Sequence, residues 1–406
     1  MKYAKKKYSL FNYNITEKTL PSKYLGKTII SYTENIIPEN SSVENPEFIP
    51  AVIDDKKFNP IFSYDKNAVH TGVGDYSSYI NSYGLELLYD VEFGYDGPEF
   101  EIIYHSPREF ALMVDEGDGW KTVCDRYILP RNDGGYLSVK ISFFDDDAVK
   151  VPSYKMRRFK LRTTGWFGGI IKNRVCSLVK TVNLSAPLAV FEGTSITESC
   201  NLISGFNAFS YSRILSDIYG FQYLCLAQGG TGMAKPLNDR PCMLDRIDQV
   251  IKAEPDILFA EVGINDQPTD TFRKYTDEFL KIIRKKLPKT FIVMIGRYHP
   301  KFIKNDDFER AEIDVITGEV CKKYGVPFIE LTTGYVYGID GEIIAEMGAP
   351  MVYGDGAVFE PNGSGTADRY TGDEVTKDGC HCNPTAYKMY AQYIRSAFNS
   401  IINSIK

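Results

Sequence analysis

The apolar residues in the first half of the chain follow a strand-like pattern. From about residue 75 to 182, short aromatic and β-branched runs recur, and no helix-length periodic segment interrupts them. Turn signals such as Asp118-Gly119 separate several of the runs. Short strands at this spacing predict an antiparallel β-sandwich or jelly roll. The runs are Leu85 to Phe93, Phe100 to His105, Phe110 to Val114, Leu137 to Phe144 and Arg158 to Thr163.

The pattern changes after Ala186, where apolar runs alternate with amphipathic stretches of helical length. Apolar strands joined by helical crossovers predict a three-layer α/β domain, in which helices cover both faces of a parallel sheet. Ligands bind such sheets beyond the carboxyl ends of the strands. The expected strands are Leu188 to Glu192, Tyr223 to Ala227, Ile257 to Val262, Phe291 to Ile295 and Pro327 to Leu331, and the expected helices are 206–219, 243–252, 268–286, 306–324 and 384–402.

These patterns divide the chain into three parts. We expect a polar, irregular N-terminal arm over residues 1–50, a β-sandwich domain over 51–185 and the α/β domain over 186–406. Residues 332–377 are rich in Gly, with several Asp and Tyr, and are too long for a simple connector. They therefore predict a lid or a loop that shapes the substrate site.

Composition and charge narrow the class of protein. With 406 residues, 43% of them hydrophobic and 25% charged, the chain is long enough for two globular domains. Its net charge of −6 comes from interspersed acids and bases, which argues against a nucleic-acid partner because no basic stripe faces phosphates. The 8 cysteines are scattered, so we expect free thiols rather than a disulfide framework.

The chain shows no targeting or membrane segment. Its basic start is not followed by the apolar stretch of roughly 7 to 15 residues that a secretory signal needs. No run approaches the roughly 18 apolar residues of a membrane span. We expect a soluble protein without a membrane partner, either cytoplasmic or released without a signal, for instance in a phage particle. The sequence does not indicate an oligomeric state.

Ser195 is the first candidate for chemistry. It lies in Phe191-Glu192-Gly193-Thr194-Ser195-Ile196-Thr197-Glu198, which follows a buried strand and precedes a helical segment. A serine in this position has an accessible hydroxyl and suits a nucleophile, with its backbone amide near a developing oxyanion. The alternative is that Ser195 or Thr197 only caps the helix.

Two further motifs follow the next strands. In Ala227-Gln228-Gly229-Gly230-Thr231-Gly232, the glycines let the backbone approach a ligand and point an amide at it. In Glu261-Val262-Gly263-Ile264-Asn265-Asp266, the Asn265 amide could reach the same oxyanion. Each motif, taken alone, is also compatible with a plain turn.

The last motif contains a histidine and an acid. In Asp378-Gly379-Cys380-His381-Cys382-Asn383-Pro384, the Asp378 carboxylate could hold the imidazole Nδ1–H of His381 while Nε2 faces a nucleophile. The alternative is a metal site made by His381 and its two cysteine neighbours. Alternate residues of an extended segment point opposite ways, and no second Cys/His pair has zinc spacing, so we expect no metal.

Together and in order, the four motifs resemble the sequence blocks of the SGNH or GDSL-like hydrolases. The resemblance covers about residues 186–406 and implies a flavodoxin-like fold. It implies Ser195 as nucleophile, His381 as base and Asp378 as the residue that orients His381. The implied oxyanion hole consists of the Ser195 amide, Gly232 and Asn265, with Gly230 as the alternative glycine.

The chain departs from the family pattern at two positions. Thr194 stands where the family usually has Asp, and Cys382 stands where it often has Pro. Neither change removes a reacting group, although Thr194 bears on how the serine turn is held. The rival α/β-hydrolase elbow, Gly-x-Ser-x-Gly, is rejected because Thr197 occupies the place of its second glycine.

The resemblance implies a serine esterase that needs no metal or organic cofactor. The segment from Arg158 to Ile170 resembles the last strands of the β-sandwich found before SGNH domains in bacterial and phage carbohydrate esterases, so we expect O-acetyl esters on carbohydrate as substrates. The alternatives are a lipase-like or thioesterase-like hydrolase of small acyl esters, and a virion structural or glycan-binding protein that carries an SGNH domain. Arg297 and His299 follow a strand end and are expected at the substrate rim.

Overall fold

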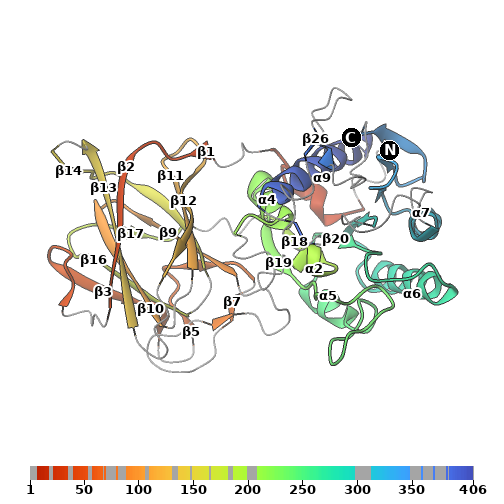
Figure 1. Cartoon of the computed structure of the whole chain (residues 1–406), viewed down its shortest axis with the longest axis horizontal. Coiled ribbons are helices and arrows are strands. Elements are labelled where there is room, and N and C mark those ends of the chain that lie inside the picture. Colours follow the sequence, from red (N-terminus) through yellow and green to blue (C-terminus); the bar gives the residue numbers. More distant parts are fainter. Residues whose placement is uncertain are drawn as a thin grey trace. The chain divides into compact units, whose positions relative to one another are not determined.

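In the computed structural model, the chain forms two compact units, and each is described by itself (Figure 1). The α/β unit comprises the described parts of residues 1–17 and 185–406, and the all-β unit comprises the described parts of 18–82 and 87–184. The structure describes residues 7–17, 22–34, 40–53, 57–66, 68–69, 79–80, 88–105, 109–129, 136–146, 149–163, 166–181, 186–198, 208–297, 312–347, 358–359, 369–370, 381–382 and 384–405.

The α/β unit is built on a mixed sheet of seven strands in the order β19-β18-β20-β21-β22-β23-β24. The first five are parallel to one another, and β23 and β24 continue the sheet antiparallel. The order of the parallel strands along the chain is 2-1-3-4-5, which is the flavodoxin-like arrangement. The strands are β18 (Leu188–Glu192), β19 (Gln222–Cys225), β20 (Ile257–Glu261), β21 (Phe291–Ile295), β22 (Phe328–Ile329), β23 (Tyr335–Tyr337) and β24 (Ile343–Glu346).

Helices cover both faces of this sheet, as the sequence pattern predicts. Successive residues of β18 enter different apolar clusters: Phe191 packs with α4 and α9, whereas Val190 packs with α5, α6 and α7. Side chains cap the N-termini of two of the helices. The Ser210 hydroxyl accepts the Arg213 N–H at α4, and the Thr269 hydroxyl accepts the Phe272 N–H at α6. The helices are η1 (Ser9–Asn12), α2 (Ser195–Glu198), α4 (Tyr211–Tyr219), α5 (Ile247–Ala253), α6 (Asp270–Lys286), α7 (Glu312–Tyr324) and α9 (Pro384–Ile405).

The all-β unit consists mainly of two larger sheets that share one apolar core. Alternate residues of β9 point into this core, and the Phe93 ring meets the Phe100 ring of the other sheet at 5.4 Å. One sheet contains β1 (Ser22–Lys23), β6 (Ser63–Tyr64), β9 (Tyr89–Tyr95), β11 (Glu109–Asp115), β12 (Trp120–Ile128), β15 (Arg157–Thr163) and β17 (Leu178–Val179). The other contains β2 (Lys27–Glu34), β3 (Pro46–Pro50), β10 (Glu99–His105), β13 (Tyr136–Asp146), β14 (Val151–Pro152) and β16 (Trp166–Asn173).

Three short two-stranded pairs complete the described elements. They are β4 (Val52–Ile53) with β5 (Lys57–Phe58), β7 (Ala68–Val69) with β8 (Tyr79–Ile80), and β25 (Val358–Phe359) with β26 (Arg369–Tyr370). Among the helices that the structure describes, none is both long and apolar enough to cross a membrane. The cysteines of the described segments are free thiols.

The prediction of an irregular arm over residues 1–50 is wrong for much of that segment. Tyr8 and Leu10 are buried in the α/β unit, where the Tyr8 ring meets Phe291 at 5.2 Å. In the all-β unit, β2 pairs with β13 over eight residues and β3 pairs with β16. Neither strand forms the buried apolar run that a pattern search detects, because Ile29 and Tyr32 of β2 are exposed and β3 begins and ends with proline, which edge strands tolerate.

The prediction of a lid over 332–377 is also wrong where β23 and β24 extend the sheet. Gly338 and Gly341 lie in the connection between these strands. Because glycines are typical of turns and loops, they hide the strand pattern of the short apolar runs on either side. Most of residues 348–377 lie outside the described residues.

We expect Phe398→Ala to lower the free energy of unfolding by about 3 to 5 kcal/mol, because it removes a ring that fixes α9 to the sheet. Phe398 is fully buried, and its ring lies 5.3 Å from that of Phe259 and 5.1 Å from that of Tyr219. Urea denaturation measures the change. Asn403→Ala, at an exposed position of the same helix, is the control and should leave the midpoint nearly unchanged. Equal stability of the two variants would contradict this packing of α9.

Candidate active site

Ser195 and His381 meet at the carboxyl edge of the parallel sheet. Ser195 is the first residue of α2 and follows β18 after Gly193-Thr194. The His381 Nε2 lies 3.0 Å from the Ser195 Oγ, although the two residues are 186 positions apart. Both are nearly buried, at 8% and 9% exposure. A hydroxyl within hydrogen-bond distance of an imidazole nitrogen is the arrangement that activates a serine nucleophile.

The segment around His381 is fixed by its neighbours on the helix side. Cys382 is fully buried in the apolar cluster beneath α9, whereas the ring of His381 contacts Ser195. The Cys382 side chain therefore packs in the core, and the His381 side chain lies at the candidate site. In the first turns of α9, the Tyr387 hydroxyl donates to the Ile196 carbonyl at 3.0 Å and ties the helix to the serine turn. Asp378 and Cys380 lie outside the described residues, so the orienting role of Asp378 stays a prediction.

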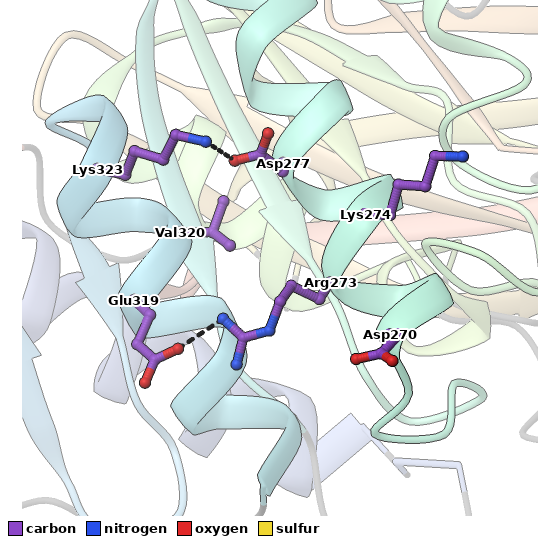
Figure 2. Close-up of a pocket in the computed structure, with 7 residues that line it drawn as sticks. All are labelled: Asp270, Arg273, Lys274, Asp277, Glu319, Val320 and Lys323. Atoms are coloured by element: carbon purple, nitrogen blue, oxygen red, sulfur yellow. Dashed lines mark hydrogen bonds and ion pairs between the residues drawn. The ribbon is translucent and has the colours of Figure 1, made fainter.

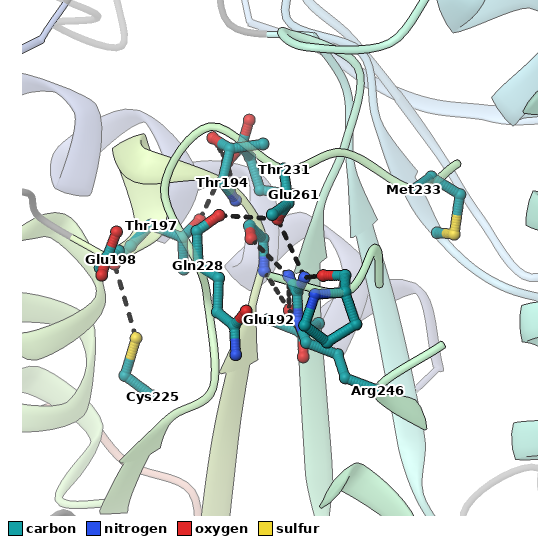
Figure 3. A network of polar contacts seen from close by, with 12 residues as sticks. Glu192, Thr194, Thr197, Glu198, Cys225, Gln228, Thr231, Met233, Arg246 and Glu261 are labelled. Carbon is teal, nitrogen blue, oxygen red and sulfur yellow. Dashed lines mark hydrogen bonds and ion pairs between the residues drawn. The ribbon is translucent and has the colours of Figure 1, made fainter. Parts of the chain in front are cut away.

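A buried carboxylate holds the turn that carries Ser195. The Glu261 Oε2, at the end of β20, accepts hydrogen bonds from the Thr194 hydroxyl at 2.8 Å, the Thr194 N–H at 3.3 Å and the Thr197 hydroxyl at 3.1 Å (Figure 3). Burial raises the pKa of the Glu261 carboxyl to about 7. The sequence motif contains Glu261 but indicates no role for it. The only signal was an acid at the end of a buried strand.

A second buried acid, Glu192, is paired with Arg246. The Arg246 guanidinium reaches the Glu192 Oε1 at 2.5 and 3.0 Å and also donates to the Gly193 carbonyl at 2.9 Å. Its remaining nitrogen donates to the Thr231 hydroxyl at 2.9 Å. One arginine therefore joins the serine loop to the glycine loop, as Figure 3 shows. The sequence signalled only an amphipathic stretch at Arg246.

The glycine loop is not arranged as predicted. The Gly232 N–H donates to the Lys235 carbonyl at 2.8 Å, so it is engaged within its own loop and does not suit an oxyanion donor. A Cβ at Gly232 would lie 2.3 Å from an oxygen of Asp266, which is the physical reason for a glycine there. By contrast, the N–H of Gly230 has no acceptor among the described residues. Of the two glycines that the sequence offers for the expected oxyanion hole, the contacts therefore favour Gly230 over Gly232.

Asn265 lies beside this loop. Its Nδ2 donates to the Thr231 carbonyl at 2.8 Å, which uses one of the two hydrogens of the amide and leaves the other. The neighbouring Asp266 accepts the Met233 N–H at 2.8 Å and the Ala234 N–H at 2.9 Å. Asp266 thus anchors the glycine loop, and Asn265 keeps one donor for a ligand.

Arg297, predicted at the substrate rim, follows β21 and lies against Gly263, where a Cβ would approach the Arg297 Cβ to 3.2 Å. Its N–H donates to the Asp314 Oδ1 at 2.8 Å, and its side-chain Nε is buried without an acceptor among the described residues. Asp314 is fully buried and also accepts the Thr332 hydroxyl. Burial raises the pKa of the Asp314 carboxyl to about 7. His299 lies outside the described residues.

The pocket in Figure 2 is a different feature of the same unit. It has a volume of about 550 Å³ and lies between α6 and α7. Four charged side chains of its lining form ion pairs with one another. Arg273 pairs with Glu319 at 2.6 Å, and Lys323 pairs with Asp277 at 2.5 Å. None of the residues of the four sequence motifs lines it. This pocket therefore contributes nothing to the chemistry at Ser195.

We expect Asp314→Asn to change how stability depends on pH. The folded-state pKa of about 7 lies above the ordinary value of 3.8, so the proton bound by Asp314 stabilises the fold fully below pH 3.8 and this stabilisation is lost as the pH rises to 7. The unfolding free energy of the variant relative to wild type should rise by about 2 to 3 kcal/mol from pH 5 to pH 8.

Thermal melts at pH 5 and pH 8 measure this difference. Glu319→Gln, an exposed acid on the same helix, is the control and should differ from wild type by a similar amount at both values. A constant difference for Asp314→Asn would show that the carboxyl ionises at its ordinary pKa in the folded protein.

Comparison with known proteins supports the fold. No family model and no curated protein matches the chain. Among solved structures, the salicylyl-acyltransferase SsfX3 from a tetracycline biosynthetic pathway matches with a TM-score of 0.51 and 13% identity, over 84% of this chain and 96% of that chain.

Two other solved structures match at lower scores. A candidate GDSL-like lipase from Bacteroides ovatus has a TM-score of 0.46 and 14% identity, over 78% of this chain and 85% of that one. A carbohydrate esterase family 2 enzyme with a carbohydrate binding domain, from Corynascus thermopiles (Myceliophthora fergusii), has a TM-score of 0.42 and 13% identity, over 87% and 99%. The match to SsfX3 shows a shared fold, and the strand order 2-1-3-4-5 agrees with the flavodoxin-like fold that the sequence resemblance implies.

Proposed function

We propose that the protein is a serine ester hydrolase whose nucleophile is Ser195 and whose base is His381. The observation that carries the proposal is the 3.0 Å contact between the Ser195 Oγ and the His381 Nε2 at the carboxyl edge of the sheet. Helix capping alone, the alternative for Ser195, gives no reason for a distant histidine to meet its hydroxyl. Asp378, implied by the family resemblance, would hold the Nδ1–H of His381.

The proposed reaction uses two acyl-transfer steps. His381 takes the proton of the Ser195 hydroxyl as the Oγ attacks the ester carbonyl carbon, and the carbonyl oxygen becomes an oxyanion. When the oxyanion collapses, the bond to the leaving oxygen breaks, and His381 gives its proton to the departing alcohol. Water then repeats both steps on the acyl-enzyme, which releases the carboxylic acid and restores Ser195.

Three donors support the oxyanion in this proposal. The N–H groups of Ser195 and Gly230 have no acceptor among the described residues, and the Asn265 amide keeps one free hydrogen. Donors fixed in place before the reaction stabilise a charge that develops only in the transition state. Gly230 has φ +77, a left-handed conformation that glycine adopts without strain.

The substrate class is the finer part of the proposal. We interpret the all-β unit, with its two sheets on one core, as the β-sandwich domain over 51–185 that precedes a hydrolase domain over 186–406. A β-sandwich before an SGNH domain is typical of carbohydrate esterases, which favours O-acetyl esters on carbohydrate as substrates. A lipase-like site should instead be lined by apolar groups, whereas the Asn265 side chain beside the glycine loop offers a polar amide.

We expect Ser195→Ala to abolish turnover of p-nitrophenyl acetate without lowering the melting temperature. Wild-type protein should prefer the acetate over the butyrate and octanoate esters. Retained turnover in Ser195→Ala would show that the nucleophile is wrong. A preference for octanoate would favour the lipase-like alternative, and an inactive wild-type protein would favour a structural or glycan-binding role.

We expect Asn265→Ala to lower kcat by about 10² to 10³-fold with little change in KM, because the amide would donate to an oxygen that is charged only in the transition state. Steady-state kinetics on p-nitrophenyl acetate, with melting temperatures, measures both. Gln267→Ala, an exposed amide two residues later, is the control. If Asn265 serves only the Thr231 carbonyl, the variant should melt earlier at wild-type kcat.

A further inference from the structure

Glu261 differs from the other buried acid of the serine turn in having no cation beside it. Glu192 is neutralised by Arg246, whereas no basic side chain of the described residues pairs with Glu261. The side chain is fully buried, and its Oε1 has no hydrogen-bond partner among the described residues. Within the described part of the chain, the donors to Glu261 come from Thr194 and Thr197, which flank Ser195.

Each threonine hydroxyl has one hydrogen to donate, and this fixes which group donates and which accepts in these hydrogen bonds. The Thr194 Oγ1 accepts the Ile196 N–H at 3.3 Å, so its single hydrogen is available for Glu261. The Thr197 hydroxyl lies 2.7 Å from the Tyr211 hydroxyl. When Thr197 donates to Glu261, Tyr211 donates to Thr197. Two chains of donors then end on one carboxylate oxygen, which fits an acceptor anion better than a protonated acid.

These contacts fix the backbone on both sides of the nucleophile. The Thr194 N–H and hydroxyl precede Ser195, the Ile196 N–H follows it, and Thr197 lies one residue further on. A shift of the turn would move the Ser195 Oγ away from His381 and the Ser195 N–H away from the oxyanion. An aspartate at position 194, which the family pattern usually has, would bring a second carboxylate to the Glu261 Oε2, whereas threonine supplies a donor.

We propose that Glu261 is a positioning residue of the esterase: its carboxylate, acting through Thr194 and Thr197, holds the serine turn in the reactive geometry. The inference rests on the proposed function. It assigns Glu261 no contact with the substrate. It also accounts for Thr194, since the hydroxyl at 194 is the group through which the carboxylate acts.

Burial makes a purely stabilising role for Glu261 unfavourable. The burial that raises its pKa to about 7 means that the ionised carboxylate destabilises the fold above that pH. The titratable groups around it are Tyr211 on α4 and Asp266 in the loop after β20, and the negative charge of Asp266 raises the pKa further. The neutral isostere Glu261→Gln should therefore lower the catalytic rate without lowering the stability of the fold.

The test compares Glu261→Gln, Thr194→Val and Thr194→Ser on p-nitrophenyl acetate. We expect Glu261→Gln and Thr194→Val to lower kcat by about 10 to 100-fold with KM within about twofold of wild type, because misplacement of a reacting group reduces rate rather than binding. Thr194→Ser keeps the hydroxyl and should restore most of kcat. Thr276→Val, which removes a fully buried hydroxyl from α6, is the control and should keep wild-type kcat.

The pH profile adds a readout that a structural role would not change. In wild type, protonation of Glu261 below about pH 7 should remove the positioning carboxylate, so the deficit of about 10 to 100-fold of Glu261→Gln relative to wild type at pH 8 should shrink as the pH falls below 7. The melting temperature of Glu261→Gln at pH 8 should equal or exceed that of wild type.

The possible failures can be told apart. Activity that survives in Ser195→Ala overturns the proposed function itself. If Ser195→Ala is inactive while Glu261→Gln keeps wild-type kcat at pH 8, the positioning role is overturned. Should Glu261→Gln not fold, the pair Thr194→Val and Thr194→Ser decides, because equal kcat in the two variants also overturns the positioning role.

Discussion

The turn that carries Ser195 leaves the sheet inside the protein, so its polar groups have to find hydrogen-bond partners within the chain rather than in water. Two acids at strand ends meet this constraint in different ways. Glu192 accepts from Arg246, whose Nη1 also reaches the glycine loop at Thr231. Among the residues that the structure describes, Glu261 accepts from the threonines of the turn itself. These buried acceptors therefore satisfy donors of the turn that water does not reach.

The same constraint explains how loops from separate strands form one site. Asp266 accepts two N–H groups of the glycine loop, and Asn265 donates to the carbonyl of that loop. Tyr387 ties the serine turn to the helix that follows His381. Each contact links segments distant in sequence, and the parallel sheet brings them together because its strands end at one edge. The donors at Ser195 and Gly230 are thereby left for a ligand.

Much of this could be predicted from the sequence, and the exceptions share a cause. The bounds of β18 and β21 were predicted correctly, since each is a continuous apolar run between turns, whereas half-exposed strands such as β2 and β12 lack such a signal. The order of motifs predicted that Ser195 and His381 meet. It could not decide between the two glycines, because the N–H of Gly232 is used up by a carbonyl of its own loop. Glu261 was given no role because its partner Thr194 lies 67 positions away.

The central claim, that His381 activates Ser195 as a nucleophile, is tested most directly by covalent labelling. The protein is incubated with a p-nitrophenyl phosphonate ester, which reacts with an activated serine and forms a stable adduct, and peptides are then analysed by mass spectrometry. The account predicts one adduct per chain, on the Ser195 side chain, with labelling that becomes much slower in His381→Ala. An adduct on a different residue, or labelling of Ser195 at the same rate in His381→Ala, would contradict it.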